Sequence, residues 1–194
     1  MSPYQDALRR LNIVLARARR LRLHEPTAMI LATVDAHGRP SVRTVLLKGV
    51  EARGLVFYTN TRSRKGRQLA ANPHAALCLW WDVLKQQVTI EGAVEPVSDA
   101  EADAYWVTRD RASQLGAWAS QQSEPLPSRA ALLKRIARYA AAFAGRSVPR
   151  PSHWSGYRLV PERIEFWTAR PFRLNERVLY ERRGARWTVT LLYP

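Results

Sequence analysis

The chain has 194 residues, a length typical of one domain, and 46% of them are hydrophobic, enough to form a buried core. Its net charge of +15 favours an anionic partner, either a nucleic acid or a small phosphorylated ligand. No apolar run is long enough to span a bilayer, arginines interrupt the N-terminus where a signal peptide would be apolar, and the single Cys78 cannot form an internal disulfide. We therefore expect a cytoplasmic protein without membrane contact, in which Cys78 is a buried thiol.

The chain begins with an amphipathic pattern that predicts a helix over residues 3–22. Strand patterns follow, and the turns between them are too short for crossover helices, so the sheet should be mainly antiparallel. We expect strands at 28–34, 41–48, 54–59, 74–81, 86–97, 156–160, 163–168, 177–182 and 186–192, and further helices at 64–71, 98–108, 111–119 and 128–144. This order predicts a mainly β (α+β) fold, an antiparallel barrel flanked by helices. It forms a single domain over 1–194, with an N-terminal helix in 1–25 and a helical insertion at 98–145.

The helix expected after Ser63 begins with two cations, Arg64 and Lys65. Cations are disfavoured at a helix N-terminus, where the backbone already presents free N–H groups and partial positive charge. The segment from Ser98 to Glu101 gives the contrast, because it is an ordinary capping box with acids in the first turn. A helix that begins with cations therefore indicates a bound anion, and phosphate is the common choice.

Two further groups of polar residues suit an anion. Arg43 and Lys48 are five positions apart on an expected strand, so they can meet one ligand only if the strand bulges or ends there. Otherwise they bind two different anions or are ordinary surface cations. The spacing of Tyr105, Arg109 and Ser113 places them on one helix face if the helix continues past Asp110. Their hydroxyl and guanidinium groups suit a phosphate monoester, and the alternative is the edge of an amphipathic helix.

The remaining candidates are less specific. Amides and hydroxyls at Gln87, Gln122 and Ser123 suit a ligand with alternating donors and acceptors, such as a flavin ring. Trp167 either covers an aromatic ligand or belongs to the core, and Arg173 and Arg177 follow it four positions apart. The sequence contains no hydrolase motif, P-loop or metal-spaced His or Cys cluster, so we expect no metal site.

Taken together, these segments resemble the pyridoxine/pyridoxamine 5′-phosphate oxidase family. The matching segments are RTVLLKG (43–49), FYTNTRSRK (57–65), QQVTIEG (86–92), RASQLGAWASQQS (111–123), IEFW (164–167) and FRLNER (172–177), in the order the family has them. The resemblance implies an FMN-binding split β-barrel of Greek-key type that works as a homodimer with FMN at the interface. It also implies conversion of pyridoxamine and pyridoxine 5′-phosphates to pyridoxal 5′-phosphate, with hydride transfer from C4′ to the flavin and dioxygen as acceptor.

The resemblance also assigns roles to residues. Lys48, Tyr105, Arg109 and Ser113 would bind the substrate phosphate, and Arg173 and Asn175 would contact the substrate ring. Arg64 and Lys65 would bind the FMN phosphate, in agreement with the helix argument. The full set implied for FMN is Arg43, Lys48, Tyr58, Thr59, Arg64, Lys65, Gln87, Gln122, Ser123, Trp167 and Arg177.

Two departures from the family pattern affect the substrate rather than FMN. Asn175 stands where the family has His, and an amide cannot titrate near neutral pH. The chain also shows no counterpart to the N-terminal segment that closes over the substrate in family members. The alternatives are a split-barrel flavin oxidase of the phenazine-biosynthesis type, a non-catalytic flavin- or pyridoxal-phosphate-binding protein and, ranked last, a nucleic-acid-binding protein. We expect no nucleic-acid partner, because no helix-turn-helix or RNA-binding signature is present.

Overall fold

The structure is a computed structural model that describes the whole chain, residues 1–194. The helices are α1 (Pro3–Arg20), α2 (Arg64–Ala71), α3 (Asp99–Trp106), α4 (Arg111–Ala119) and α5 (Arg129–Ala142), with a 3-10 turn, η1, at Pro171–Arg173. The strands are β1 (Ala28–Val34), β2 (Pro40–Leu46), β3 (Gly49–Glu51), β4 (Gly54–Asn60), β5 (His74–Trp81), β6 (Gln86–Pro96), β7 (Trp154–Thr168), β8 (Glu176–Arg183) and β9 (Arg186–Leu192). None of the helices is both long and apolar enough to cross a bilayer.

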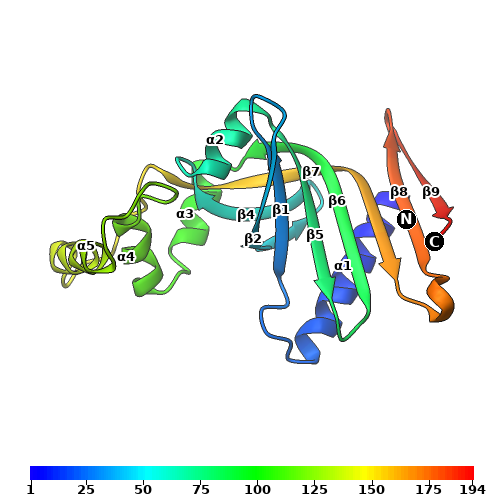
Figure 1. The fold of residues 1–194 in the computed structure, drawn as a ribbon, viewed down its shortest axis with the longest axis horizontal. Helices are drawn as coiled ribbons and strands as arrows, with labels where there is room; N and C mark the ends of the chain where they lie inside the picture. Colours follow the sequence, from blue (N-terminus) through cyan, green and yellow to red (C-terminus); the bar gives the residue numbers. More distant parts are fainter.

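All nine strands belong to one sheet, and every pairing in it is antiparallel, as predicted. The main path runs β2-β1-β5-β6-β7-β4-β3, and β8 and β9 extend it from the other end of β7. The sheet curls strongly, so that it forms a split barrel rather than a flat layer (Figure 1).

The bend in the sheet is concentrated in β7, a single 15-residue strand where the sequence predicted two separate strands. Its pairing with β6 shifts register between Glu91 and Gly92, opposite Pro161. A Cβ on Gly92 would lie 2.0 Å from the carbonyl oxygen of Val160, so only glycine allows the two strands to approach at this bulge. Glu162 is the residue without a partner at this bulge, and β7 continues past Pro161, pairing with β4 on one half and with β8 on the other.

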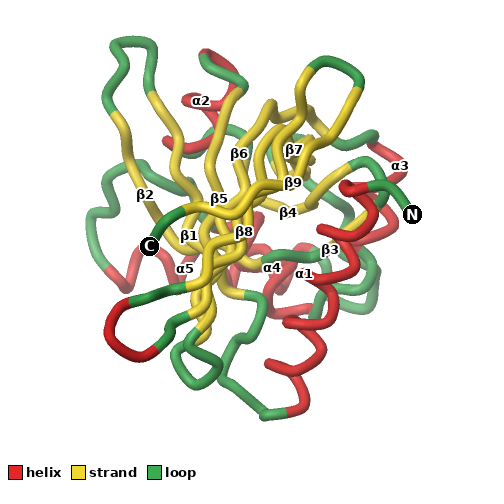
Figure 2. The backbone as a smooth tube through the Cα atoms, turned by 90° about the vertical axis from the view of Figure 1, so that its right-hand side faces the viewer, coloured by secondary structure: helices red, strands yellow, loops and turns green.

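Helix α1 fills the open side of the curled sheet. Its buried face consists of Ala7, Leu11, Val14, Leu15 and Ala18, which join the main hydrophobic core of 22 buried residues. The helix contacts β3 near one end of the sheet and the β8–β9 hairpin at the other, and Figure 2 shows it lying alongside the strands. This packing explains the amphipathic pattern in the sequence.

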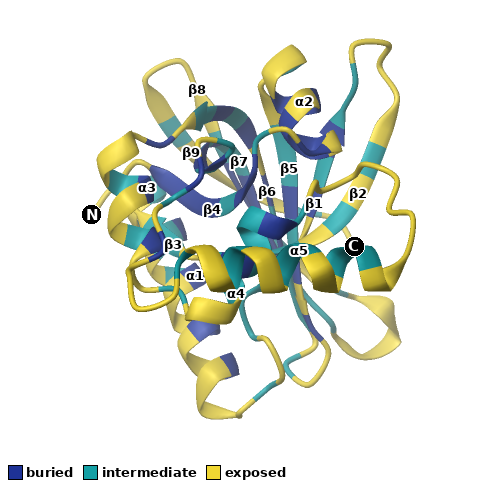
Figure 3. Ribbon diagram, turned by 90° about the vertical axis from the view of Figure 1, so that its left-hand side faces the viewer, coloured by how far each residue is buried: buried dark blue, intermediate teal, exposed yellow.

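The other helices gather away from α1. Helices α3, α4 and α5 extend from the end of the sheet opposite the β8–β9 hairpin (Figure 1). Helix α5 has no buried residue, and most of its surface is exposed in Figure 3. A small second core of Trp106, Leu115, Val148 and Trp154 joins these helices to the start of β7.

Two further expectations from the sequence are wrong. The strand expected over 41–48 stops at Leu46, and a short strand, β3, begins at Gly49, so Lys48 lies between two strands. Cys78 is half-buried rather than buried, and its partial burial raises the pKa of the thiol.

Candidate functional site

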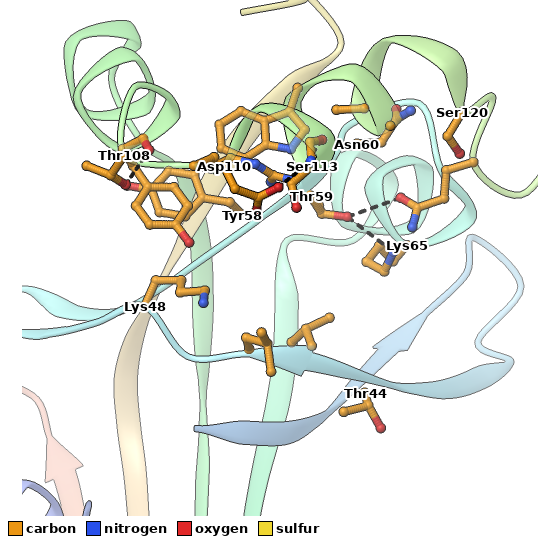
Figure 4. A pocket seen from close by; sticks show the side chains of 18 of the residues that line it. Thr44, Lys48, Tyr58, Thr59, Asn60, Lys65, Thr108, Asp110, Ser113 and Ser120 are labelled. Carbon is orange, nitrogen blue, oxygen red and sulfur yellow. Dashed lines mark hydrogen bonds between the residues drawn. The ribbon is translucent and has the colours of Figure 1, made fainter. Parts of the chain in front are cut away.

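A cavity of about 750 Å³ lies among β2, β4, the loop before β3, and helices α3 and α4. Cations, hydroxyls and aromatic rings line it (Figure 4). Eight of its lining residues were predicted from the sequence: Lys48, Tyr58, Thr59, Lys65, Tyr105, Arg109, Ser113 and Gln122. These residues come from four separate regions of the chain, and the curled sheet brings them together.

Lys65 lies at one end of this cavity, in the first turn of α2. Ser63 caps the helix, with its hydroxyl accepting from the Gly66 N–H. The side chain of Lys65 is buried, and its Nζ donates to Thr59 Oγ1 at 3.1 Å. Thr59 Oγ1 in turn lies 3.4 Å from Gln122 Oε1, which it donates to. No carboxylate pairs with this ammonium; burial lowers the pKa of Lys65, and the nearby Arg43 lowers it further.

Two arginines adjoin Lys65. The guanidinium of Arg43 donates to Thr33 Oγ1 at 2.6 Å, and to Ser41 Oγ and Gln68 Oε1 at 2.7 and 3.1 Å. The backbone N–H of Arg64 donates to Ser123 Oγ at 3.1 Å. Burial and the charge of Arg64 both lower the pKa of Arg43. Arg43, Arg64 and Lys65 form no ion pair with a carboxylate, an arrangement that suits an anionic ligand.

A second group of cations lies elsewhere on the cavity wall, and Lys48 and Lys65 are well separated in Figure 4. The Nζ of Lys48 is 6.0 Å from the centre of the Tyr105 ring. Arg109 stacks over Trp154 at 4.8 Å and donates through Nη2 to the Ser113 carbonyl oxygen at 3.2 Å. Its Nε is buried without a partner, and burial lowers the pKa of this guanidinium. A half-buried guanidinium that lines a cavity and forms no ion pair suits a second anionic ligand.

A break separates the helices that carry Tyr105 and Ser113, at Asp110, where the sequence indicated one. Helix α3 ends at Trp106, and α4 begins at Arg111 because Asp110 caps it by accepting from the Ser113 N–H at 2.8 Å. The three side chains still line one cavity, since the turn between the helices folds α4 back toward the same space.

Trp154 is a lining residue that the sequence reasoning missed. Its ring stacks on Tyr58 at 5.3 Å, and Tyr58 stacks on Tyr105 at 4.1 Å, so three aromatic rings form one wall. Asn60, Thr44 and Thr108 also line the cavity without having been predicted. A tryptophan at the start of a strand is common in cores, so only the register of β7 opposite β4, which pairs it with Asn60, reveals this position.

The remaining predicted residues lie apart from the cavity. Gln87, Trp167 and Arg177 are neighbours across β6, β7 and β8, and Arg177 binds the Glu165 carboxylate at 2.7 Å. Gln87 and Trp167 line a smaller cavity of about 230 Å³ against α1.

Arg173 and Asn175 lie in the connection from β7 to β8, which is remote from α3 and α4 in Figure 1. Phe172 and Arg173 have positive φ values of 59° and 61°, and Asn175 Oδ1 accepts from the Arg170 N–H. One subunit therefore does not bring this group to the cavity.

Comparison with known proteins supports the resemblance. Residues 15–143 match the pyridoxamine 5′-phosphate oxidase family, and residues 154–194 match the C-terminal dimerisation region of pyridoxine 5′-phosphate oxidase. A pyridoxine/pyridoxamine 5′-phosphate oxidase of Rhodospirillum rubrum is 57% identical over 176 residues, which cover 88% of each chain. That of Alkalilimnicola ehrlichii is 60% identical over 169 residues, covering 87% of this chain and 86% of its own.

Solved structures share the fold over the whole chain. PhzG from Burkholderia lata, in complex with tetrahydrophenazine-1-carboxylic acid, superposes with a TM-score of 0.92 at 37% identity, over 100% of this chain and 98% of its own. An FMN-binding protein of Nostoc punctiforme related to pyridoxamine 5′-phosphate oxidase has a TM-score of 0.78 at 22% identity, with the same coverage. With two family models spanning the sheet and the cavity and relatives above 50% identity, the chain belongs to the pyridoxine/pyridoxamine 5′-phosphate oxidases, FMN-dependent oxidoreductases with a split-barrel fold.

Proposed function

We propose that this protein oxidises pyridoxamine 5′-phosphate and pyridoxine 5′-phosphate to pyridoxal 5′-phosphate, with dioxygen as electron acceptor. The observation that carries the proposal is the presence of two separate groups of unpaired cations around one cavity. Lys65 belongs to one group, and Lys48 and Arg109 to the other. Two anion sites suit two phosphorylated molecules, a cofactor and a substrate. The curated relatives carry the name of this activity.

The residues at the Lys65 end fit FMN. A buried ammonium and two guanidinium groups without a carboxylate partner suit its phosphate, while the amide of Gln122 and the hydroxyl of Thr59 offer neutral hydrogen bonds beside them. When bound, FMN supplies the redox chemistry, by accepting a hydride from C4′ of the substrate and passing the electrons to dioxygen. The protein supplies binding and orientation, which is consistent with the lack of any catalytic triad in the cavity.

The other end of the cavity fits the substrate phosphate. The guanidinium of Arg109, the hydroxyls of Tyr105 and Ser113 and the ammonium of Lys48 are all donors on the same wall. The stacked rings of Tyr58, Tyr105 and Trp154 form an aromatic part of this wall beside the donors.

We further propose that two copies of the chain complete each site, with FMN at their interface. Gln87, Trp167 and Arg177 are on strands away from the cavity, as are Arg173 and Asn175, so a single subunit leaves both cofactor and substrate half-surrounded. The match of residues 154–194 to a dimerisation region supports this arrangement, because that segment carries four of these five residues. In the second copy, Arg173 and Asn175 would contact the substrate ring.

The proposal is tested anaerobically. The purified protein is loaded with FMN, pyridoxamine 5′-phosphate is added, and the visible absorbance of the flavin is followed. We expect rapid bleaching that air reverses, and formation of pyridoxal 5′-phosphate. Pyridoxamine without its phosphate is the matched control and should bleach the flavin far more slowly. Arg109→Ala should slow the reaction with the phosphorylated substrate, whereas Arg53→Ala, at an exposed arginine of the β3–β4 turn, should not. A flavin that stays yellow would refute the proposal.

A second candidate is an oxidase of the phenazine-biosynthesis type. The observation in its favour is the similarity to PhzG over the whole chain, together with Asn175 in the place of the family His. The phosphate-suited cluster of Lys48, Tyr105, Arg109 and Ser113 favours the B6 vitamers instead. Bleaching by a dihydro- or tetrahydrophenazine carboxylate but not by pyridoxamine 5′-phosphate would select this second candidate.

A further inference from the structure

The proposed substrate-phosphate site is assembled from two elements that are far apart in sequence. Lys48 precedes β3, whereas Tyr105 is in the last turn of α3 and Arg109 follows that helix. Helix α3 has only eight residues and buries only Ala102 and Trp106. Polar contacts add to this small buried surface, and they are what links the helix to β3.

One buried guanidinium connects the two elements. Arg158 is on β7, and its side chain is only 2% exposed. Its Nη2 donates to Glu51 Oε2 at 2.7 Å and to Glu101 Oε1 at 2.5 Å, and Nη1 lies 3.7 Å from Glu95 Oε1. Glu51 ends β3, three residues after Lys48, and Glu101 is in the first turn of α3, one turn before Tyr105. A single side chain thus bridges both sides of the site.

Glu101 also belongs to the N-terminal cap of α3, so it links Arg158 to the start of the helix. Its second carboxylate oxygen, Oε2, accepts from the backbone N–H and the hydroxyl of Ser98, at 2.8 and 2.9 Å, which completes the capping box of α3. The Glu101 carbonyl oxygen also accepts from the Tyr58 hydroxyl, and the Tyr58 ring stacks on Tyr105. Arg158 therefore acts on the start of α3, on its capping residue, and on the ring that supports Tyr105.

The other ionic contacts of α3 are weaker. Arg150 donates to Asp99 and Asp103, but these carboxylates are 87% and 59% exposed, so water competes for both. The Arg158 guanidinium is shielded from solvent, and its loss would leave Glu51 and Glu101 without an ionic partner, close to Glu95, which Arg53 would still bind.

We propose that Arg158 is a positioning residue for the substrate phosphate: by joining Glu51 to Glu101 it sets the separation between Lys48 and the Tyr105–Arg109 side of the site. The inference rests on the proposed function for the identity of the ligand. The Lys65 end of the cavity makes its own contacts through Thr59, Gln68 and Ser123, none of which involves α3. Loss of Arg158 should therefore weaken binding of a phosphorylated vitamer and leave FMN binding intact.

The test compares Arg158→Met and Arg158→Lys with Arg53→Met. Arg53 binds the same Glu95 at 2.6 Å, but it is exposed and touches neither Glu51 nor Glu101. Titration calorimetry on FMN-loaded protein gives the dissociation constants of pyridoxal 5′-phosphate and of pyridoxal, and a separate titration gives that of FMN. In Arg158→Met we expect pyridoxal 5′-phosphate to bind about 10- to 100-fold more weakly, with pyridoxal and FMN nearly unchanged. Arg158→Lys should recover part of the loss, and Arg53→Met should match the wild type.

Preference for the phosphorylated vitamer is the ratio of the dissociation constants of pyridoxal and pyridoxal 5′-phosphate. An equal ratio in the wild type and in folded Arg158→Met would overturn the inference. If Arg158→Met does not fold, Glu101→Gln decides, because it keeps the shape of the side chain and removes the ionic bond; an unchanged preference there also overturns it. A wild type that neither binds pyridoxal 5′-phosphate nor oxidises pyridoxamine 5′-phosphate would refute the proposed function. Inorganic phosphate is then the probe: weaker binding in the variant supports the positioning role, and equal or absent binding overturns it.

Discussion

Lys65 shows how a single residue can serve binding at the expense of stability. Its ammonium is buried, has one hydroxyl partner in Thr59, and is close to Arg43 without any carboxylate beside it. Burial and the neighbouring cation both lower its pKa, so the charged form is less favoured in the folded protein than in water. A bound phosphate would reverse this, since it would partner the charge that the fold has desolvated.

We therefore predict opposite effects of Lys65→Met on stability and on cofactor binding. A charge-assisted hydrogen bond contributes about 1.5–3 kcal/mol, so FMN should bind roughly 10- to 150-fold more weakly. The protein without FMN should be as stable as the wild type or more stable, since methionine keeps the apolar stem and removes the buried charge. Fluorescence titration with FMN and thermal unfolding of the FMN-free protein measure the two effects. A marked loss of stability without FMN would contradict this account, and Lys85→Met, at an exposed lysine, is the control.

At the scale of elements, α3 depends on ionisation of Glu101. The hydrogen bond from Arg158 is the main cause that lowers the pKa of this carboxyl from 4.5 to about 2, and the bonds from Ser98 add to it. A carboxyl whose pKa is lower in the folded state stabilises the fold fully above its unfolded value. That contribution is lost as the pH falls from about 4.5 toward 2.

Glu101→Gln should accordingly flatten the acid limb of the stability curve. The unfolding free energy of the wild type should fall between about pH 5 and pH 2, and that of the variant should fall less. The variant should therefore be less stable than the wild type at neutral pH, and the two should converge in acid. Denaturant unfolding at a series of pH values gives both curves. Asp82→Asn, in the exposed β5–β6 turn, is the matched control and should keep the full acid limb. Parallel curves for Glu101→Gln and the wild type would show that this carboxyl does not couple to folding.

The periodic patterns in the sequence predicted most elements, because burial on one face decides both helices and strands. They failed where tertiary context prevailed. Pro161 reads as a strand end, yet the bulge at Gly92 lets β7 continue through it. The break between α3 and α4, by contrast, lies at Asp110, where the sequence indicated it. The cationic end of the cavity was predicted from the sequence, because a helix that begins with a cation such as Lys65 indicates a bound anion. Trp154 could not be predicted, since its place depends on the pairing of β7 with β4.

At the scale of the whole molecule, the sheet leaves an apolar face exposed. Ile30, Val42 and Trp80 are 42%, 67% and 48% exposed, and they lie on adjacent strands β1, β2 and β5. Ile30 pairs with Cys78, and Val42 pairs with Ala32, so these side chains project from the same face of the sheet. Exposed apolar side chains clustered on one sheet face are typical of a surface that another subunit covers.

We predict that this face is part of the dimer interface that completes the site, and that Val42→Asp separates the subunits. A carboxylate buried against a second apolar face would be unpartnered, which costs several kcal/mol per site and should shift dimers to monomers at micromolar concentration. Because Gln87, Trp167 and Arg177 would then be missing from each cavity, FMN affinity should fall together with dimerisation. Analytical ultracentrifugation and FMN titration measure the two effects on the same samples. Leu133→Asp, at an exposed leucine on α5, is the control. A monomeric Val42→Asp that binds FMN as tightly as the wild type would show that one subunit holds the cofactor alone.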